Sequence, residues 1–311
     1  MEPVYDVIIV ITPADYKRVR GNFERLLNLM PADKIVFVGS SEVGELIKTE
    51  SWQERAGFVD ENEVLPFEDV SRVIADILKI EKVPRGLVGW YYQQFLKMNY
   101  SKFSKHPYYL TWDGDTVPTK QFSMFEKEGN KPYFDLKYEE HREYFVTLSR
   151  LLGMDKVIGK SFISEHMLFN CEIMSNLIAD IEGNTSIEGQ YFYEKILRAI
   201  RPEALQSNSF SEFETYGTYV AYKYRDVYKL KDWHSVRYGS IYFEPDKMTE
   251  EDYKWLSLDF DAVSFEKNED YNPDYGALFS NPSYREKLRP RQILEAIQEF
   301  DVEGNVKEVW E

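Results

Sequence analysis

The sequence predicts an α/β protein in which helices flank a mostly parallel central sheet. Short β-branched runs alternate with longer segments whose apolar residues recur at helical spacing, as in parallel strands joined by helices. The first run, residues 4–11, is largely apolar, as expected of a strand that is buried on both faces. With 311 residues, the chain is long enough to bury a sizeable core.

The first half of the chain supplies this regular alternation. Strands are predicted at residues 4–11, 34–38 and 108–112. Apolar residues at helical spacing predict helices at residues 19–30, 42–47, 70–80 and 90–103. Ser41 is the expected N-cap of the second of these helices.

The second half is more irregular. It contains a predicted strand at residues 133–136 and predicted helices at residues 139–152, 173–181, 187–200 and 211–224. Ser211 and Glu214 fit a capping box at the start of the last helix. Charged and turn residues increase near the C-terminus, and a final helix is predicted at residues 291–300, after Pro290. We therefore expect a main domain over residues 1–245 and a helical or irregular appendage, residues 246–311, packed on it.

The net charge restricts the partners. The chain carries 54 acidic and 38 basic residues, a formal net charge of −16. Binding to a phosphate backbone depends on clustered Lys and Arg, so no nucleic-acid partner is expected. Electrostatic attachment to anionic lipid is disfavoured for the same reason, which leaves peripheral membrane contact of another kind as an alternative.

The single cysteine and the N-terminal residues indicate the cellular compartment. Cys171 is the single cysteine, so no intramolecular disulfide can form and a reducing compartment is expected. No basic region precedes an apolar stretch at the start, so no signal peptide is expected, and the apolar run at residues 7–11 is too short to span a bilayer. We expect a cytoplasmic protein with no transmembrane segment.

The motif Asp113-Gly114-Asp115 directly follows the predicted strand 108–112. Ligand sites in open α/β sheets collect at the carboxyl ends of strands, and oxygen-only ligands favour Mg2+ or Mn2+. Gly114 has no Cβ, so a ligand can approach the backbone there. The motif therefore predicts a divalent-cation site that holds a substrate phosphate. The structural alternative is a hairpin turn, because Asp-Gly is common in such turns.

Two enzymatic interpretations fit the motif. In nucleotide-sugar glycosyltransferases, an Asp-x-Asp binds a cation that bridges the donor diphosphate. The motif also matches that of phosphatases of the haloacid-dehalogenase type. In that interpretation Asp113 would be the nucleophile and Asp115 the acid/base, but that family carries its motif on the first strand. Asp259 and Asp261 repeat the first motif of that family rather than supply its last, and we interpret them as lying on an exposed segment without a role. A non-catalytic sugar-binding protein is the third alternative.

Three further segments carry candidate residues. Gln93 or Gln94 shares a helix face with Lys97 and is a candidate to bind a nucleotide or diphosphate. The alternative is a solvated helix face, with Trp90, Phe95 and Met98 packed inward. Glu165 and His166 form an acid–imidazole pair that suits deprotonation of an acceptor hydroxyl or a metal site, with a partly exposed polar pair before a helix as the alternative. Arg237 is a candidate to bind phosphate oxygens, and His234 is a candidate metal ligand from late in the chain. The alternative for both is an ordinary surface side chain.

Taken in order, five segments resemble the DUF6492 family of glycosyltransferase-like proteins, found largely in bacterial polysaccharide loci. They are residues 7–13, 89–97, 113–116, 165–169 and 211–217. The resemblance runs from about residue 4 to residue 242, with the tail outside it. It implies a GT-A-like, Rossmann-type fold with an Asp-x-Asp.

The resemblance also implies roles for individual residues. Asp113 and Asp115 would bind Mn2+ or Mg2+ and the donor diphosphate, with Thr12, Gln94 and Lys97 on the donor side. Glu165, His166 and Glu214 would be catalytic or acceptor-side residues. The leading hypothesis is a metal-dependent glycosyltransferase that moves a sugar from a UDP-linked donor to a glycan or lipid-linked saccharide in surface-polysaccharide synthesis.

Overall fold

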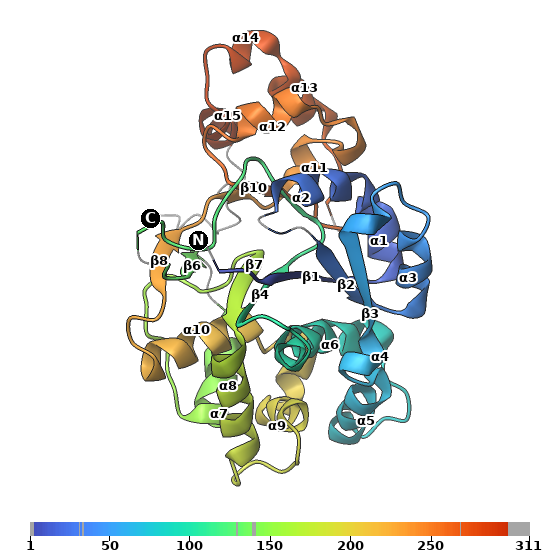
Figure 1. Ribbon diagram of the computed structural model, residues 1–311, viewed down its shortest axis with the longest axis vertical. Coiled ribbons are helices and arrows are strands. Elements are labelled where there is room, and N and C mark those ends of the chain that lie inside the picture. The colour runs from blue at the N-terminus through green and yellow to red at the C-terminus, as the bar shows by residue number, and fades with distance from the viewer. Residues whose placement is uncertain are drawn as a thin grey trace.

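The computed structural model describes residues 3–30, 32, 34–128, 130–138, 141–267 and 269–297. Its main sheet has five strands in the order β3-β2-β1-β4-β7 (Figure 1). The strands are β1 (Asp6–Val10), β2 (Ile35–Gly39), β3 (Ala56–Asp60), β4 (Tyr108–Trp112) and β7 (His166–Asn170). The first four are mutually parallel and β7 is antiparallel to β4. The predicted α/β class with a mostly parallel sheet is therefore confirmed.

Helices cover both faces of this sheet (Figure 1). One face packs against α1 (Pro13–Val19), α2 (Phe23–Leu29) and α3 (Ser41–Ile47). The other face packs against α5 (Phe67–Leu78), α6 (Arg85–Asn99), α7 (Arg142–Leu152), α8 (Cys171–Gly183), α9 (Phe192–Ala199) and α10 (Glu212–Lys223). Successive residues of β1 alternate between the two cores, Val7 and Ile9 in one and Ile8 in the other, because side chains alternate along a strand.

Two small sheets adjoin the main one. The first has the order β5-β10-β9, with β5 (Thr116–Pro118), β10 (Ala262–Ser264) and β9 (Ser235–Val236). In the second, β6 (Tyr133–Leu136) pairs with β8 (Lys229–Asp232). β10 belongs to the segment predicted as an appendage, yet it pairs with the strand that follows the Asp-Gly-Asp motif.

The C-terminal segment forms a third hydrophobic core around buried Leu256, Phe260 and Phe279. Its helices are α11 (Gly239–Tyr242), α12 (Glu250–Leu256), α13 (Pro273–Ser280), α14 (Pro282–Arg285) and α15 (Pro290–Ile297). The remaining short helices are α4 (Glu61–Val64), η1 (Arg20–Asn22), η2 (Gln53–Arg55), η3 (Tyr100–Lys102), η4 (Pro202–Ser207) and η5 (Pro245–Lys247). Within the described ranges, every helix is too short or too polar to cross a bilayer.

Several sequence expectations need correction. The sequence does not predict β3 or β7: β3 is a short edge strand that contains Gly57, and β7 is a five-residue run with no strand signal of its own. The expected helix 19–30 is divided by η1, and the expected helix 187–200 is limited to α9. Ser40, not Ser41, is the N-cap of α3. Parts of two predicted helices, residues 139–140 and 298–300, lie outside the described residues.

Candidate active site

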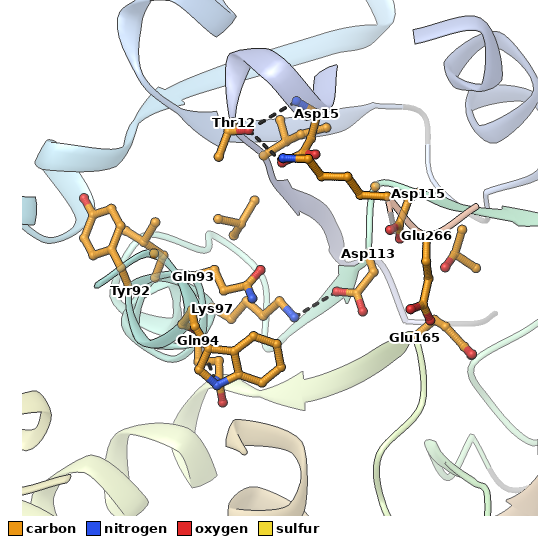
Figure 2. A pocket seen from close by; sticks show the side chains of 18 of the residues that line it. Thr12, Asp15, Tyr92, Gln93, Gln94, Lys97, Asp113, Asp115, Glu165 and Glu266 are labelled. Carbon is orange, nitrogen blue, oxygen red and sulfur yellow. Dashed lines mark hydrogen bonds and ion pairs between the residues drawn. The ribbon is translucent and has the colours of Figure 1, made fainter. Parts of the chain in front are cut away.

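A cleft of about 1180 Å3 opens at the carboxyl ends of β1 and β4. Its lining includes the ends of these strands, one side of α6, the start of α10 and part of the segment after β10 (Figure 2). This is the edge at which parallel α/β sheets hold ligands. Thr12, Gln94, Lys97, Asp113, Asp115, Glu165 and Arg237 line it, while His166 and Glu214 do not.

The motif forms a tight turn after β4, in which Thr116 N donates to Asp113 O at 3.0 Å. The turn does not join a hairpin, because β4 and β5 belong to different sheets. A Cβ on Gly114 would lie 3.0 Å from side-chain carbons of Ile9 and Ile11. Glycine is therefore explained by close packing of the turn on the end of β1, rather than by the approach of a ligand that the sequence suggested.

The two motif carboxylates have different cationic neighbours. Lys97 Nζ lies 2.9 Å from Asp113 Oδ1, a contact that is drawn in Figure 2. It also lies 2.9 Å from Glu212 Oε1. Burial alone would lower the pKa of Lys97, but Asp113 and Glu212 outweigh it and raise that pKa, so the ammonium stays charged. Arg18 Nη2 lies farther away, 3.7 Å from Asp115 Oδ2.

The pKa of Asp115 is raised to about 7, first by desolvation in the cleft and then by the neighbouring carboxylates of Asp113 and Glu266. Arg18 offsets this only in part. The site therefore retains negative potential beyond what Lys97 and Arg18 neutralise, which fits a bound cation.

Asp113 and Asp115 supply the oxygen ligands that Mg2+ and Mn2+ prefer. In the part of the chain that the structure describes, no group of three or more His, Cys, Asp and Glu side chains is arranged to hold a metal. The residues thus fit a cation that takes its remaining ligands from substrate oxygens and water, as Mg2+ commonly does with phosphates.

Glu165 lies in the cleft wall but is 9% exposed and fully engaged. Its Oε1 accepts from Lys137 Nζ and from Ser235 Oγ, both at 2.7 Å, and its Oε2 accepts from Trp233 Nε1 at 3.0 Å. Burial alone would raise the pKa of Glu165, but the charge and hydrogen bond of Lys137, with the Ser235 hydroxyl, lower it to about 2. A carboxylate held in this way is a weak proton acceptor.

His166 is buried and does not line the cleft. It opens β7 opposite Trp112, and its Nε2 lies 2.8 Å from Asp135 Oδ2. Its ring packs against the rings of Trp112 and Trp233 with centroids 4.9 and 4.4 Å away. The alternative of a partly exposed pair before a helix is wrong, since Glu165 and His166 are both buried and lead into a strand.

Glu214 is 2% exposed and lies inside α10. The Ser211 N-cap of the predicted capping box is confirmed, because Ser211 Oγ accepts from Glu214 N at 3.2 Å. The Glu214 carboxylate extends elsewhere, accepting from Ser161 Oγ at 2.7 Å and from Phe162 N at 3.1 Å. These contacts join α10 to the loop ahead of β7.

The predicted donor-side residues have distinct settings. Thr12 is the N-cap of α1 and accepts from Asp15 N at 3.2 Å. Gln94 links two helices: its Nε2 donates to Trp90 O at 3.2 Å and its Oε1 accepts from Glu212 N at 3.0 Å. Arg237 Nε donates to Glu266 Oε1 at 2.8 Å at the edge of the cleft.

Asp259, Asp261 and His234 lie outside the cleft lining. Asp261 accepts from His234 N at 3.2 Å and pairs with Lys120 at 3.0 Å, while Asp259 pairs with Arg289. The segment is not exposed as expected, because it leads into the buried strand β10.

The cleft lining also contains charged residues that the sequence does not predict, among them Arg18, Lys137, Glu212 and Glu266. Glu212 was within reach of sequence reasoning, since it follows the predicted cap Ser211. The other three carry no local motif and come to the cleft only through tertiary structure.

The structure is that of an α/β protein with a large cleft at the carboxyl ends of its parallel strands. The chain belongs to the DUF6492 family, a family of unknown function, whose sequence profile matches residues 22–305. The expectation that the tail lies outside the resemblance is therefore wrong. No curated relative matches the chain.

Three solved structures are similar in overall arrangement. Mouse xyloside xylosyltransferase 1 in its apo form is 14% identical, with a TM-score of 0.46, over 86% of this chain and 99% of that one. The galactosyltransferase LgtC, with donor and acceptor sugar analogues, is 9% identical, with a TM-score of 0.44, over 91% and 100%. The bifunctional glycosyltransferase WbbM is 11% identical, with a TM-score of 0.42, over 95% and 52%. Values this low do not assign an activity to this chain.

Proposed function

We propose that this protein is a metal-dependent glycosyltransferase of the GT-A type that uses a UDP-linked sugar donor. One observation carries the proposal: Asp113 and Asp115 stand at the carboxyl end of a parallel strand, in a large cleft that is also lined by Lys97 and three arginines, Arg18, Arg85 and Arg237. Paired carboxylates beside cationic side chains suit a metal-bound diphosphate, which needs both a cation and direct hydrogen-bond donors.

In this proposal Asp113 and Asp115 hold Mn2+ or Mg2+, which neutralises charge on the leaving diphosphate. Lys97 fixes the orientation of Asp113 through their 2.9 Å contact. Arg237 supplies a guanidinium for phosphate oxygens once it leaves Glu266. Thr12, at the end of β1, lies on the nucleotide side of the cleft.

On the acceptor side, the contacts change the roles that the sequence suggested. With its pKa near 2, Glu165 serves as a fixed negative charge in the cleft wall rather than as a base. His166 and Glu214 support the loops around it from within the core. A glycan or lipid-linked saccharide remains the proposed acceptor, and the cytoplasm the proposed location. No observation favours the phosphatase alternative, since β1, β2 and β3 all precede the motif strand.

The proposal is tested by incubating the protein with UDP-sugars and Mn2+ and measuring release of UDP, with and without oligosaccharide acceptors. We expect release that stops when EDTA is added. Phosphate release from a generic phosphomonoester, without any nucleotide requirement, would indicate the phosphatase alternative. Binding of sugars without turnover would indicate a non-catalytic protein.

A further inference from the structure

One side of α6 faces the cleft along most of its length. Gly86, Gly89, Trp90, Gln93 and Lys97 all line the cleft, and their spacing of three to four residues places them on one face of the helix. No charged residue occurs between Arg85 and Lys97. The part of α6 that lines the cleft is therefore uncharged between two cations, Arg85 at the start of the helix and Lys97 beside the motif.

Gln93 and Gln94 differ sharply in their surroundings. Gln94 is buried, and both ends of its amide are hydrogen-bonded within the protein. Gln93 is half-buried in the cleft, and none of the residues that the structure describes forms a hydrogen bond with its side chain. Figure 2 shows its amide directed from α6 toward the space in front of Asp113. A polar group held on a rigid helix inside a cleft and without a protein partner is available to a ligand.

The surface next to Gln93 is apolar and open. Trp90 is half-buried and lines the cleft. A Cβ on Gly86 or Gly89 would meet no atom within 4 Å, so the helix leaves room there. A pyranose ring has an apolar C–H face and a rim of hydroxyl groups. An aromatic ring beside an uncharged amide matches both features.

We propose that this face of α6 binds the sugar carried by the donor, with Trp90 beneath the ring and Gln93 reading the orientation of its hydroxyl groups. The proposal rests on the proposed function. Lys97 connects this face to the motif: it lies one turn beyond Gln93, and Lys97 Nζ is 2.9 Å from Asp113 Oδ1. A diphosphate held at the motif has its sugar against Gln93.

The test is calorimetry in Mn2+ with four ligands: UDP, UDP-glucose, UDP-galactose and UDP-N-acetylglucosamine. We expect Gln93→Ala to weaken binding of the preferred UDP-sugar by about 3- to 10-fold, the value of one neutral hydrogen bond. The affinity of Gln93→Ala for UDP should stay within about twofold of that of the unaltered protein. The differences in its affinity for the three UDP-sugars should become smaller. Ala is the best helix former, so α6 is retained. Gln206→Ala, an exposed glutamine outside the cleft lining, is the matched control and should change nothing.

Trp90 is tested in the same way. Trp90→Phe keeps an aromatic face and should retain most of the affinity for the sugar, whereas Trp90→Ala should lose it. If Gln93→Ala weakens UDP as much as the UDP-sugars, the residue contacts the nucleotide and the inference is overturned while the proposed function stands. Unchanged binding in Gln93→Ala, or equal binding of all three sugars by the unaltered protein, also overturns it. If the unaltered protein binds none of the four ligands, the proposed function fails and the inference with it.

Discussion

Carboxylates in the same cleft differ in proton affinity because their neighbours differ. Glu165 has three donors, one of them an ammonium, and its pKa falls to about 2. Asp115 is desolvated beside other carboxylates with only a distant guanidinium, and its pKa rises to about 7. The same functional group, a carboxylate, is thus a permanent anion at Glu165, while at Asp115 its charged form is disfavoured until a cation binds.

Asp115→Asn should fold normally and lose turnover. Asparagine keeps the side-chain volume but removes a metal ligand, so we expect a loss on the order of 100-fold or more. Because its neighbours already disfavour the charged form of Asp115, the free energy of unfolding should not fall. Urea denaturation and UDP release measured on one preparation check both parts. Near-normal turnover would place the chemistry elsewhere.

Glu165→Gln should lower the free energy of unfolding by about 3 kcal/mol near pH 7, because Lys137 is left buried without its counter-charge. The pKa of Glu165 is lower in the folded chain than its ordinary value of 4.5. Its contribution is therefore complete above pH 4.5 and is lost as the pH falls toward 2. Urea denaturation at several pH values should show the gap between variant and wild type closing over that window.

Its control is the double variant that adds Lys137→Met. Removing both charges should recover part of the loss, since an unpaired buried charge costs more than an absent pair. A double variant no more stable than Glu165→Gln would contradict this explanation.

At the scale of helices and strands, the sequence predicts the features that depend only on residues nearby in the chain. The caps at Ser211 and the periodicity of α6 depend on neighbours within a few residues, and both were predictable. β7 was not, because a five-residue run becomes a strand only by pairing with β4. The alternation along that run then places Glu165 in the cleft wall and His166 in the core, which no motif could reveal. Likewise, a helical pattern could not tell Gln93 from Gln94.

Contact between α10 and the loop before β7 depends on Gly217. A Cβ there would lie 2.2 Å from Phe162 Cγ, so Gly217→Ala must push the two apart. We expect a loss of about 1–3 kcal/mol in the free energy of unfolding, measured by urea denaturation. Gly183→Ala, at the end of α8 with open space around its Cβ position, is the control and should be neutral or stabilising. Equal effects at the two positions would contradict the packing argument.

At the scale of the whole molecule, the charge of −16 works against an anionic ligand. We therefore expect UDP to bind only in the presence of a divalent cation, which calorimetry with and without EDTA will show. Equal affinity for UDP with and without EDTA would contradict the proposed metal dependence. Charge and composition were readable from the sequence. The convergence of Arg18, Lys137 and Glu266 on one cleft was not, because it depends on contacts between segments more than 100 residues apart.

The position of β10 has a consequence for how the chain folds. Its residues pair with β5 across about 145 positions, and Phe265 N donates to the Asp115 carbonyl at 2.9 Å. Closing so long a loop costs entropy that only the finished pairing repays, and distant pairings slow folding. During synthesis from the N-terminus, β1, β2, β3 and β4 are complete well before residue 262 leaves the ribosome. The hydrogen bond from Phe265 N to the motif turn therefore forms late. In a nascent chain, the four parallel strands can assemble before the cleft is complete.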